Sequence, residues 1–317
     1  MDLMELIKNM KGMSLYFSLK RGYFRARTAI IPSNVYGKIL YFLTYRRLLH
    51  LSSSRCRRYD EKLWWLKEHY HNPLMTVCAD KWAVREYVKQ CGLEEILNVS
   101  FGHFKSIEDI KIDDIPDEDF FVKCNHLSGG NIICHKSTFS DDLKKVRPLF
   151  RELLKNNCYY YGYEWPYKNI KPSIVVEKVL CTDELYGLLD YKFMCFEGEP
   201  RLLFLDIGVA QKNGTHAKEY YRNIYDMDFV PTKIKETREH YDYSKIPKPE
   251  NWEFMKECCR KLSKPFPHCR VDLYNIHGKV YFGEITFYHG SGMNRIEPDE
   301  ADLMMGSWIP MVEYGHI

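Results

Sequence analysis

The sequence contains no apolar run near the ~18–20 residues that a membrane-spanning helix needs. It also lacks the charged start and clean apolar stretch of a secretory signal. Its eleven cysteines include no Cys-x-x-Cys pair, which favours reduced, mostly buried thiols and argues against a zinc site. Internal repeats and low-complexity tracts are missing as well. These absences predict a globular protein of the cytoplasm.

Acidic residues are nearly missing from the first 58 positions. Residues 1–58 carry 12 Lys/Arg and 2 Asp/Glu, a net charge of +10, and the remainder has 34 Lys/Arg and 41 Asp/Glu, a net of −7. A basic leader on an acidic body is not typical of a nucleic-acid binder, and we expect no such partner. Aromatic residues alternate with cations in 16–25 and 39–49. Two interpretations stay open. The leader is a helical segment packed on the body, or it makes peripheral contact with the inner face of an anionic membrane.

At 317 residues, the chain is long enough for two domains or subdomains. Apolar periodicity and turn residues predict helices and strands in alternation. Helices are expected at 59–70 (amphipathic, with Leu63 and Leu66 on one side), 81–91 (with Asp80 as N-cap), 141–155 and 251–262. Strands are expected at 120–124, 132–134, 173–180, 191–196 and 201–207. Asn72-Pro73 is expected to form a loop, and the polar stretch 211–246 a long mobile loop or lid.

The most informative segment is a predicted hairpin near the C-terminal end. Residues 270–274 and 281–286 are apolar and aromatic-rich, and they flank a short turn. Asp272 and Glu284 would project from neighbouring strands, with Arg270 beside Asp272. Two carboxylates at this spacing suit Mg²⁺, which binds through one or two carboxylates together with substrate phosphates.

Lysines at strand ends form a second pattern. Lys123 ends an apolar strand and precedes a small loop that contains Gly129 and Gly130. Backbone amides in such a loop can hold phosphate oxygens, and the lysine adds a point charge. Lys178 ends another strand, and main-chain groups at the edge of that strand could hydrogen-bond to an adenine. Lys192 lies among apolar strand residues, where a charge needs a partner such as phosphate.

Taken in order along the chain, these segments resemble the ATP-grasp superfamily, and within it the TupA-like group of polysaccharide biosynthesis. The resemblance runs from about Tyr59 to about Gly306, and the leader lies outside it. It is carried by EKLWWLK, ADKWAVREYV, FVKCNHLSGGNII, IVVEKVL, DYKF and RVDLY…YFGEITFYHGSG.

The resemblance implies an α+β, ATP-grasp fold in which two α+β subdomains clamp ATP, preceded by a short helical N-terminal segment. The implied division is a basic helical leader at 1–58, a reduced N-terminal or linker region at 59–115, a first subdomain at 116–180 and a second, with the metal site, at 181–317.

The resemblance also assigns roles to particular residues. Residues implied to bind ATP are Lys81, Lys123, the loop residues Ser128, Gly129, Gly130 and Asn131, the hinge residues Glu177, Lys178 and Leu180, Glu184 on the ribose, and Lys192. Arg270 and Lys192 are implied to be catalytic. Asp272, Glu284 and Thr286 are implied ligands of two Mg²⁺ ions, although many relatives carry Asn where Thr286 stands.

The implied activity is that of an ADP-forming carboxylate–amine ligase of extracellular or capsular polysaccharide biosynthesis, acting through an acyl phosphate. Its substrate would be a small molecule, such as a sugar acid, or a lipid-linked glycan. Two alternatives are a glycosyltransferase that uses Asp226 and Asp228 as a D-x-D motif, and a non-catalytic ATP-binding module.

Overall fold

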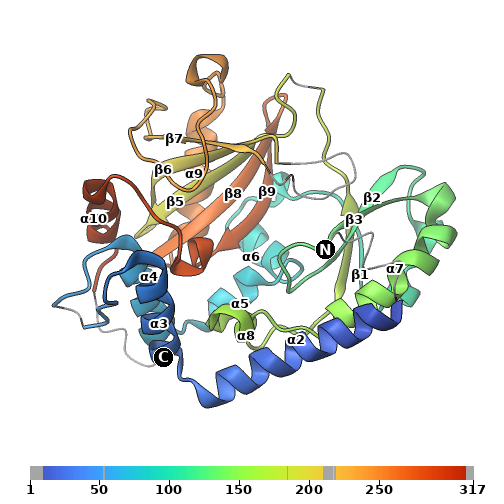
Figure 1. Cartoon of the computed structure of the whole chain (residues 1–317). Coiled ribbons are helices and arrows are strands. Elements are labelled where there is room, and N and C mark those ends of the chain that lie inside the picture. The colour runs from blue at the N-terminus through green and yellow to red at the C-terminus, as the bar shows by residue number, and fades with distance from the viewer. Residues whose placement is uncertain (1–9, 53, 184, 210–216, 218, 312–317) are drawn as a thin grey trace.

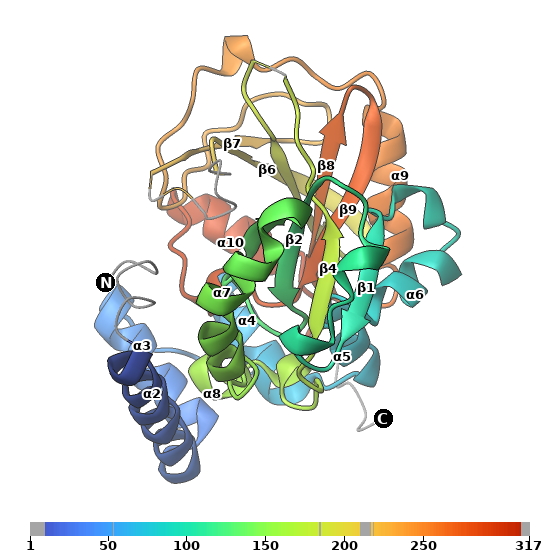
Figure 2. The same cartoon turned by 90° about the vertical axis from the view of Figure 1, so that its right-hand side faces the viewer.

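Two antiparallel sheets form the body of the protein in the computed structural model, which describes residues 10–311 except 53, 184, 210–216 and 218. The first sheet has the order β1-β4-β2-β3 and the second the order β7-β6-β5-β8-β9. This α+β architecture agrees with the expected fold class. Figure 2 shows the first sheet in front of the second.

The first sheet comprises β1 (Ser100–Phe104), β2 (Asp119–Cys124), β3 (Ile132–His135) and β4 (Ile174–Lys178). Along β2, Phe120, Val122 and Cys124 are buried in a core that includes Leu149 and Phe150 of α7 (Phe139–Leu153). Because side chains alternate along a strand, the residues between them point to the other face of the sheet. That face carries Lys123.

The second sheet comprises β5 (Asp190–Phe196), β6 (Glu199–Ile207), β7 (Tyr221–Tyr225), β8 (His268–Ile276) and β9 (Lys279–Thr286). Helix α9 (Trp252–Ser263) packs on one of its faces, where Phe193 contacts Trp252 with ring centroids 5.2 Å apart. The predicted hairpin is confirmed, and its register pairs Asp272 directly with Glu284. Alternation along β5 therefore turns Lys192 away from α9.

The leader is helical, as expected, and its inner side packs on the body. Helix α2 (Met10–Ile30) contacts α7 and α8 (Tyr159–Gly162), and α3 (Ser33–Tyr45) contacts α4 (Tyr59–His69) (Figure 1). Gly37 of α3 lies so close to Trp64 that an added Cβ would come within 2.7 Å of the indole. None of the described helices is both long and apolar enough to cross a membrane.

Three expectations about local structure are wrong in part. Helix α4 was expected to bury one side only, yet it is buried from Tyr59 to Lys67, with Lys62 donating to the Ile309 carbonyl at 2.9 Å and α10 (Asp299–Ser307) packed beside it. Asn72 lies in the expected connection and its side chain caps α5 (Pro73–Ala79), but Pro73 is already the first residue of that helix. The next helix, α6 (Val84–Gln90), begins three residues later than predicted, although the Asp80 carboxylate accepts from the amides of Trp82 and Ala83.

The stretch 211–246 is not a simple lid. Residues 210–216 and 218 lie outside the described residues, but 221–225 form β7 at the edge of the second sheet. Arg222 and Glu236 are buried there and form an ion pair. The described part of this segment therefore contains a strand and a buried ion pair, which differ from the expected mobile loop.

Candidate functional site

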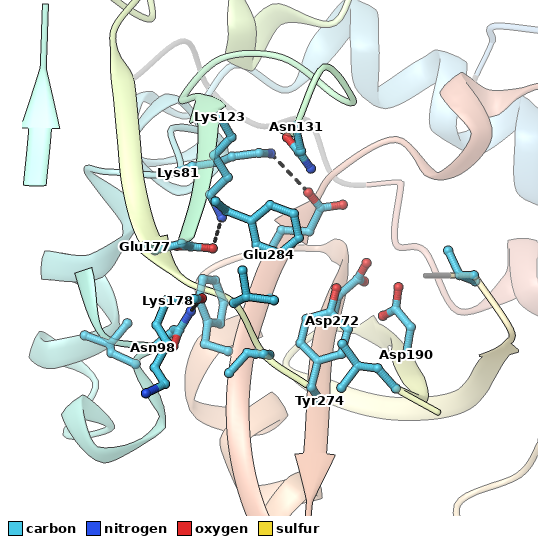
Figure 3. A pocket seen from close by; sticks show the side chains of 18 of the residues that line it. Lys81, Asn98, Lys123, Asn131, Glu177, Lys178, Asp190, Asp272, Tyr274 and Glu284 are labelled. Carbon is cyan, nitrogen blue, oxygen red and sulfur yellow. Dashed lines mark hydrogen bonds and ion pairs between the residues drawn. The ribbon is translucent and has the colours of Figure 1, made fainter. Parts of the chain in front are cut away.

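A cleft of about 240 Å³ separates the two sheets and receives side chains from both (Figure 3). Eleven of the predicted site residues line it: Lys81, Lys123, Ser128, Gly129, Asn131, Glu177, Lys178, Leu180, Lys192, Asp272 and Glu284. These positions are up to about 200 residues apart in the chain. The fold brings them together because β2 and β4 supply one wall and β5, β8 and β9 the other.

The wall from the first sheet presents a lysine and a glycine-containing loop. Lys123 on β2 pairs with Glu177 on β4. The loop that follows β2 turns through Gly129 and Gly130, both with positive φ (78° and 75°). A Cβ on Gly129 would meet open space, whereas one on Gly130 would come within 2.9 Å of Leu153 on α7. Gly129 thus keeps the loop open towards the cleft, and Gly130 lets it pack on the helix.

Asn131 ends this loop with an unused acceptor. Its side-chain Oδ1 is buried, and no donor from the described residues reaches it. A buried amide oxygen without a partner costs free energy, so it marks a position where a bound donor is favoured.

The wall from the second sheet concentrates opposite charges. Lys192 Nζ lies 2.5 Å from Asp190 Oδ2 and 2.8 Å from Asp272 Oδ2. Arg270 Nε and Nη2 donate to the two oxygens of Asp272 at 2.6 and 2.7 Å. Such a bidentate contact fixes the planar guanidinium.

Arg270 also connects this cluster to Glu284. Its Nη2 lies 3.0 Å from Glu284 Oε1 and 3.1 Å from Thr286 Oγ1, and Thr286 donates to the same glutamate oxygen at 3.2 Å. The other glutamate oxygen, Oε2, lies 3.3 Å from Lys81 Nζ. Three cations therefore converge on two carboxylates at one end of the cleft.

The charges in this cluster are stabilised by one another. Burial alone would raise the pKa of Glu284, but Lys81 and Arg270 hold it well below its usual range. Burial raises the pKa of Asp190 to about 6 in spite of Lys192. Burial opposes the charge of Arg270, yet Asp272 raises its pKa further. Burial likewise opposes the charge of Lys192, but Asp190 and Asp272 raise its pKa, so Lys192 and Arg270 stay protonated near neutral pH.

A hydrogen-bonded chain holds Arg270 from behind. Arg270 Nη1 donates to His289 Nδ1 at 2.9 Å, so the proton of a neutral His289 resides on Nε2, which donates to Glu236 Oε1 at 2.6 Å. Glu236 in turn pairs with Arg222, whose Nε and Nη2 bind both oxygens of Asp206 at 2.5 and 2.7 Å. This chain fixes the direction in which the guanidinium points.

Apolar side chains also line the cleft. They are Leu97, Phe121, Ile133, Val179, Leu180, Leu188, Val209 and Phe282. The backbone of Lys178 is occupied, since its amide donates to the Val99 carbonyl at 3.0 Å and its carbonyl accepts from Asn98 at 2.8 Å. Val179 and Leu180, which directly follow Lys178, also line the cleft. A flat apolar ring with polar edges would fit between these walls.

The carboxylate oxygens of the cleft fit a magnesium ion whose remaining ligands are phosphate and water. No group of three or more His, Cys, Asp or Glu side chains among residues 10–311, as far as described, is arranged to hold a metal. Asp272 and Glu284 nevertheless face each other across β8 and β9 and offer hard oxygens. Mg²⁺ commonly takes one or two carboxylates and completes its shell with phosphate and water. The donor set is therefore compatible with Mg²⁺ that arrives with a phosphate.

Other predicted residues lie outside the lining of the cleft. Arg270 and Thr286 stand one layer behind it, in contact with its carboxylates. Gly130 packs on α7, and Glu184 lies outside the described residues. The D-x-D pair does not reach the cleft, because Asp226 Oδ1 accepts from the amides of Asp228 and Val230 within a turn.

Sequence reasoning missed several residues of the site. Asp190 carried a usable signal, since it precedes Lys192 by two residues in a strand and must share its face. His289 was noticed only as part of a glycine-rich phrase. Asn98, Glu236 and Arg222 gave no local signal, because their partners are distant in the sequence.

Comparisons with known proteins agree with this arrangement. The sequence model of one family, described as TupA-like ATPgrasp, matches residues 61–310. None of the curated proteins compared with the sequence matches it.

Solved structures of ligases are similar at low identity. An L-amino acid ligase from Bacillus licheniformis is 14% identical, with a TM-score of 0.46 over 74% of this chain and 49% of that chain. A D-alanine–D-alanine ligase from Bacillus anthracis, solved with ATP, is 17% identical, with a TM-score of 0.39 over 67% of this chain and 55% of that one. The corresponding ligase from Helicobacter pylori is 15% identical, with a TM-score of 0.38 over 74% and 62%. The chain spans about half the length of the first two.

Proposed function

Since this chain belongs to the TupA-like ATP-grasp family, we propose that it is an ATP-dependent ligase that joins a carboxylate to an amine and forms ADP. The observation that carries the proposal is the composition of one cleft. Its apolar lining side chains suit a purine, and the same cleft gathers Lys81, Lys123 and Lys192 with Asp272 and Glu284.

In the proposed complex, the adenine lies against Phe282 and Leu180, and its polar edge meets the backbone of 179–180. The triphosphate extends towards Lys123 and the Gly129 loop, where the Asn131 side chain is available. Lys123 would exchange its contact with Glu177 for phosphate oxygens, since a phosphate offers several acceptors.

Asp272 and Glu284 are the residues that would hold Mg²⁺, with Thr286 beside Glu284. Bound Mg²⁺ neutralises phosphate charge as it develops. The chain's own cations contribute to the same end. Arg270 lies behind the cleft lining, fixed on both carboxylates and on His289, so it would hold these carboxylates in place and add positive charge beside the transferring phosphoryl group.

The proposed reaction starts with transfer of the γ-phosphoryl group to a carboxylate oxygen. The resulting acyl phosphate is attacked by an amine, which loses a proton and displaces phosphate as the amide forms. Phosphoryl transfer depends mainly on positioning and charge stabilisation, which these residues supply. Because an acyl phosphate hydrolyses readily, the enclosed position of the carboxylates between two sheets would limit access of water.

The proposed substrate is a sugar acid or a lipid-linked glycan of extracellular or capsular polysaccharide synthesis. Support for it is limited to the family to which the chain belongs. The glycosyltransferase interpretation gains no support from the geometry, because Asp226 serves a turn away from the cleft.

The proposal is tested by measuring ADP release with Mg²⁺ and ATP across a panel of uronic acids, amino acids and amino sugars. We expect release that depends on one acid and one amine together, and an amide product visible by mass spectrometry. Hydroxylamine should intercept an acyl phosphate as a hydroxamate when the amine is omitted.

The matched control is Glu239→Gln, which removes an exposed carboxylate whose ion-pair partner is Lys235. It should retain full ADP release, whereas Glu284→Gln should lose it. ATP binding without ADP release under every substrate pair would instead favour the non-catalytic module.

A further inference from the structure

Helix α2 has two apolar faces, and only one of them packs on the protein. On the inner face, Met13 is buried against the first-sheet core, Phe17 packs beside it, and Phe24 contacts Tyr161 of α8 with ring centroids 4.8 Å apart. Cations on this side are paired: Arg21 with Glu152 at 2.8 Å, and Arg27 with the Tyr160 carbonyl at 2.5 Å. The inner face therefore accounts for the helix as part of the fold.

The outer face of α2 carries large apolar side chains that point into solvent. Leu15, Leu19, Tyr23 and Ile30 are 61%, 65%, 63% and 77% exposed. At about 100° per residue, these four positions fall within roughly 80° of the helix circumference. They form one continuous stripe along a helix of 21 residues. Isolated exposed leucines need no explanation, but a stripe of this kind marks an interaction surface.

Helix α3 repeats the arrangement. Its inner residues Gly37 and Tyr41 are buried against α4, whereas Val35, Ile39 and Leu43 are 43%, 51% and 57% exposed. These three lie within about 80° of one another on the helix. Both leader helices thus keep an apolar outer side after the fold has formed.

The charged residues that the leader itself contributes beside these outer faces are cations. Between residues 6 and 58 the sequence contains no Asp or Glu. Arg25, Lys38 and Arg46 are exposed, and Arg47 is held by Asp299 at 3.0 Å. A second copy of the same basic surface would repel this one, so self-association through the stripe is disfavoured. An anionic partner that also accepts apolar side chains fits both properties.

We propose that the outer faces of α2 and α3 bind a membrane surface rich in anionic lipid. The apolar stripe would enter the boundary between headgroups and acyl chains, and the exposed cations would contact the headgroups. The inference goes beyond the proposed ligase activity and does not depend on it, because it concerns residues outside the cleft.

Vesicle sedimentation of the full chain tests this proposal. Vesicles of phosphatidylcholine with about 30% phosphatidylglycerol should bind the protein at least about tenfold more strongly than phosphatidylcholine alone, and the difference should shrink as salt rises from 0.1 to 0.5 M. The variant Leu15→Ser/Leu19→Ser/Tyr23→Ser should lose most of the binding, and Lys38→Glu/Arg46→Glu should lose the preference for anionic lipid.

The matched control is Leu185→Ser/Val230→Ser, which removes exposed apolar side chains (85% and 54%) outside the leader. It should bind vesicles as the unmodified chain does. All variants should keep the same unfolding midpoint and the same ATP binding, which separates this test from that of the ligase activity. Equal binding to both vesicle types, unaltered binding by the stripe variant, or a dimer in solution that the stripe variant dissociates would overturn the proposal.

Discussion

At the scale of single residues, the two predicted metal carboxylates differ in their surroundings. Asp272 is 2% exposed and holds both Lys192 and Arg270, whereas the Glu284 side chain is 40% exposed and opens into the cleft. Both line the cleft, but because Asp272 is buried between two cations, we expect its replacement to lower stability more than that of Glu284. Removing the Asp272 carboxylate leaves two buried cations with one fewer partner.

We predict that Asp272→Asn lowers the free energy of unfolding by about 3–5 kcal/mol, because breaking a buried ion pair strands its partner. Glu284→Gln should cost less than about 1 kcal/mol, since its carboxylate is partly solvated. Both should reduce ADP release by about 100-fold or more. Urea unfolding and steady-state kinetics on the pair separate the two effects; an equal loss of stability in both variants would contradict the assignment of Asp272 as the buried partner.

A second residue-scale prediction concerns the two loop glycines. Gly130→Ala would drive a methyl group into Leu153 and force a positive φ on alanine, so we expect lower stability, by about 1–3 kcal/mol. Gly129→Ala suffers only the conformational cost, because space is open around it. Thermal unfolding should rank Gly130→Ala as the less stable variant, and the reverse order would show that the loop packs differently.

At the scale of secondary structure, local patterns predicted the strands that build the cleft. The β8–β9 hairpin followed from two aromatic-rich runs around a turn, and its register places Asp272 opposite Glu284 as expected. The same alternation placed Lys192 on the cleft face of β5. These features depend on contacts close in sequence or on a period of two, which a sequence displays directly.

Elements that depend on distant pairing were not predictable. Residues 221–246 look like a polar loop, yet Arg222 is neutralised by Asp206 and by Glu236 inside the protein. Helix α4 was expected to be amphipathic. Its polar side is covered by α3 and α10, and the local sequence of α4 does not indicate these contacts. A core segment that contains buried charges has the composition of a surface segment, so the sequence alone does not distinguish the two.

We predict that Glu236→Gln destabilises the protein by about 3–5 kcal/mol, since it leaves the buried Arg222 short of charge and weakens the bond to His289. Glu239→Gln, three residues away and exposed, should change stability by less than about 0.5 kcal/mol. Denaturant unfolding of the two variants provides the comparison. Similar midpoints would mean that 219–246 does not pack as described.

At the scale of the whole molecule, the leader and the family region form one folded unit. The family match begins at residue 61, but Tyr45 on α3 donates to the Asp60 carboxylate at 2.5 Å and Gly37 closes over Trp64. Removing 1–58 would expose α4, so the outer stripe is better tested by substitution than by deletion. The packing interpretation of the leader describes its inner faces, and membrane binding remains a proposal for the outer ones.

A histidine buried in the core makes the stability of the protein depend on pH. His268 lies between Tyr59, whose hydroxyl donates to Nε2 at 3.0 Å, and the Cys195 carbonyl, which accepts from Nδ1 at 2.8 Å, and burial lowers its pKa to about 3. The unfolded chain, with a histidine pKa near 6.5, binds more protons between about pH 3 and 6.5. Stability from this residue is therefore lost as pH falls through that window.

We predict that lowering the pH from 7 to 5 narrows the stability difference between the unmodified chain and His268→Gln by about 2 kcal/mol. Other buried groups titrate equally in both proteins, so the difference isolates His268. Urea unfolding at each pH gives the measurement. A difference that stays constant would mean that His268 is accessible to protons in the folded state.

The central claim is that the cleft between the two sheets binds ATP with Mg²⁺, and calorimetry tests it most directly. We predict that ATP binds in the presence of Mg²⁺ and much more weakly without it, and that Lys123→Ala weakens binding by about 10- to 100-fold through the loss of a charge-assisted contact. Glu239→Gln should bind as the unmodified chain does. Absence of magnesium-dependent binding, together with unchanged behaviour of Lys123→Ala, would contradict the account.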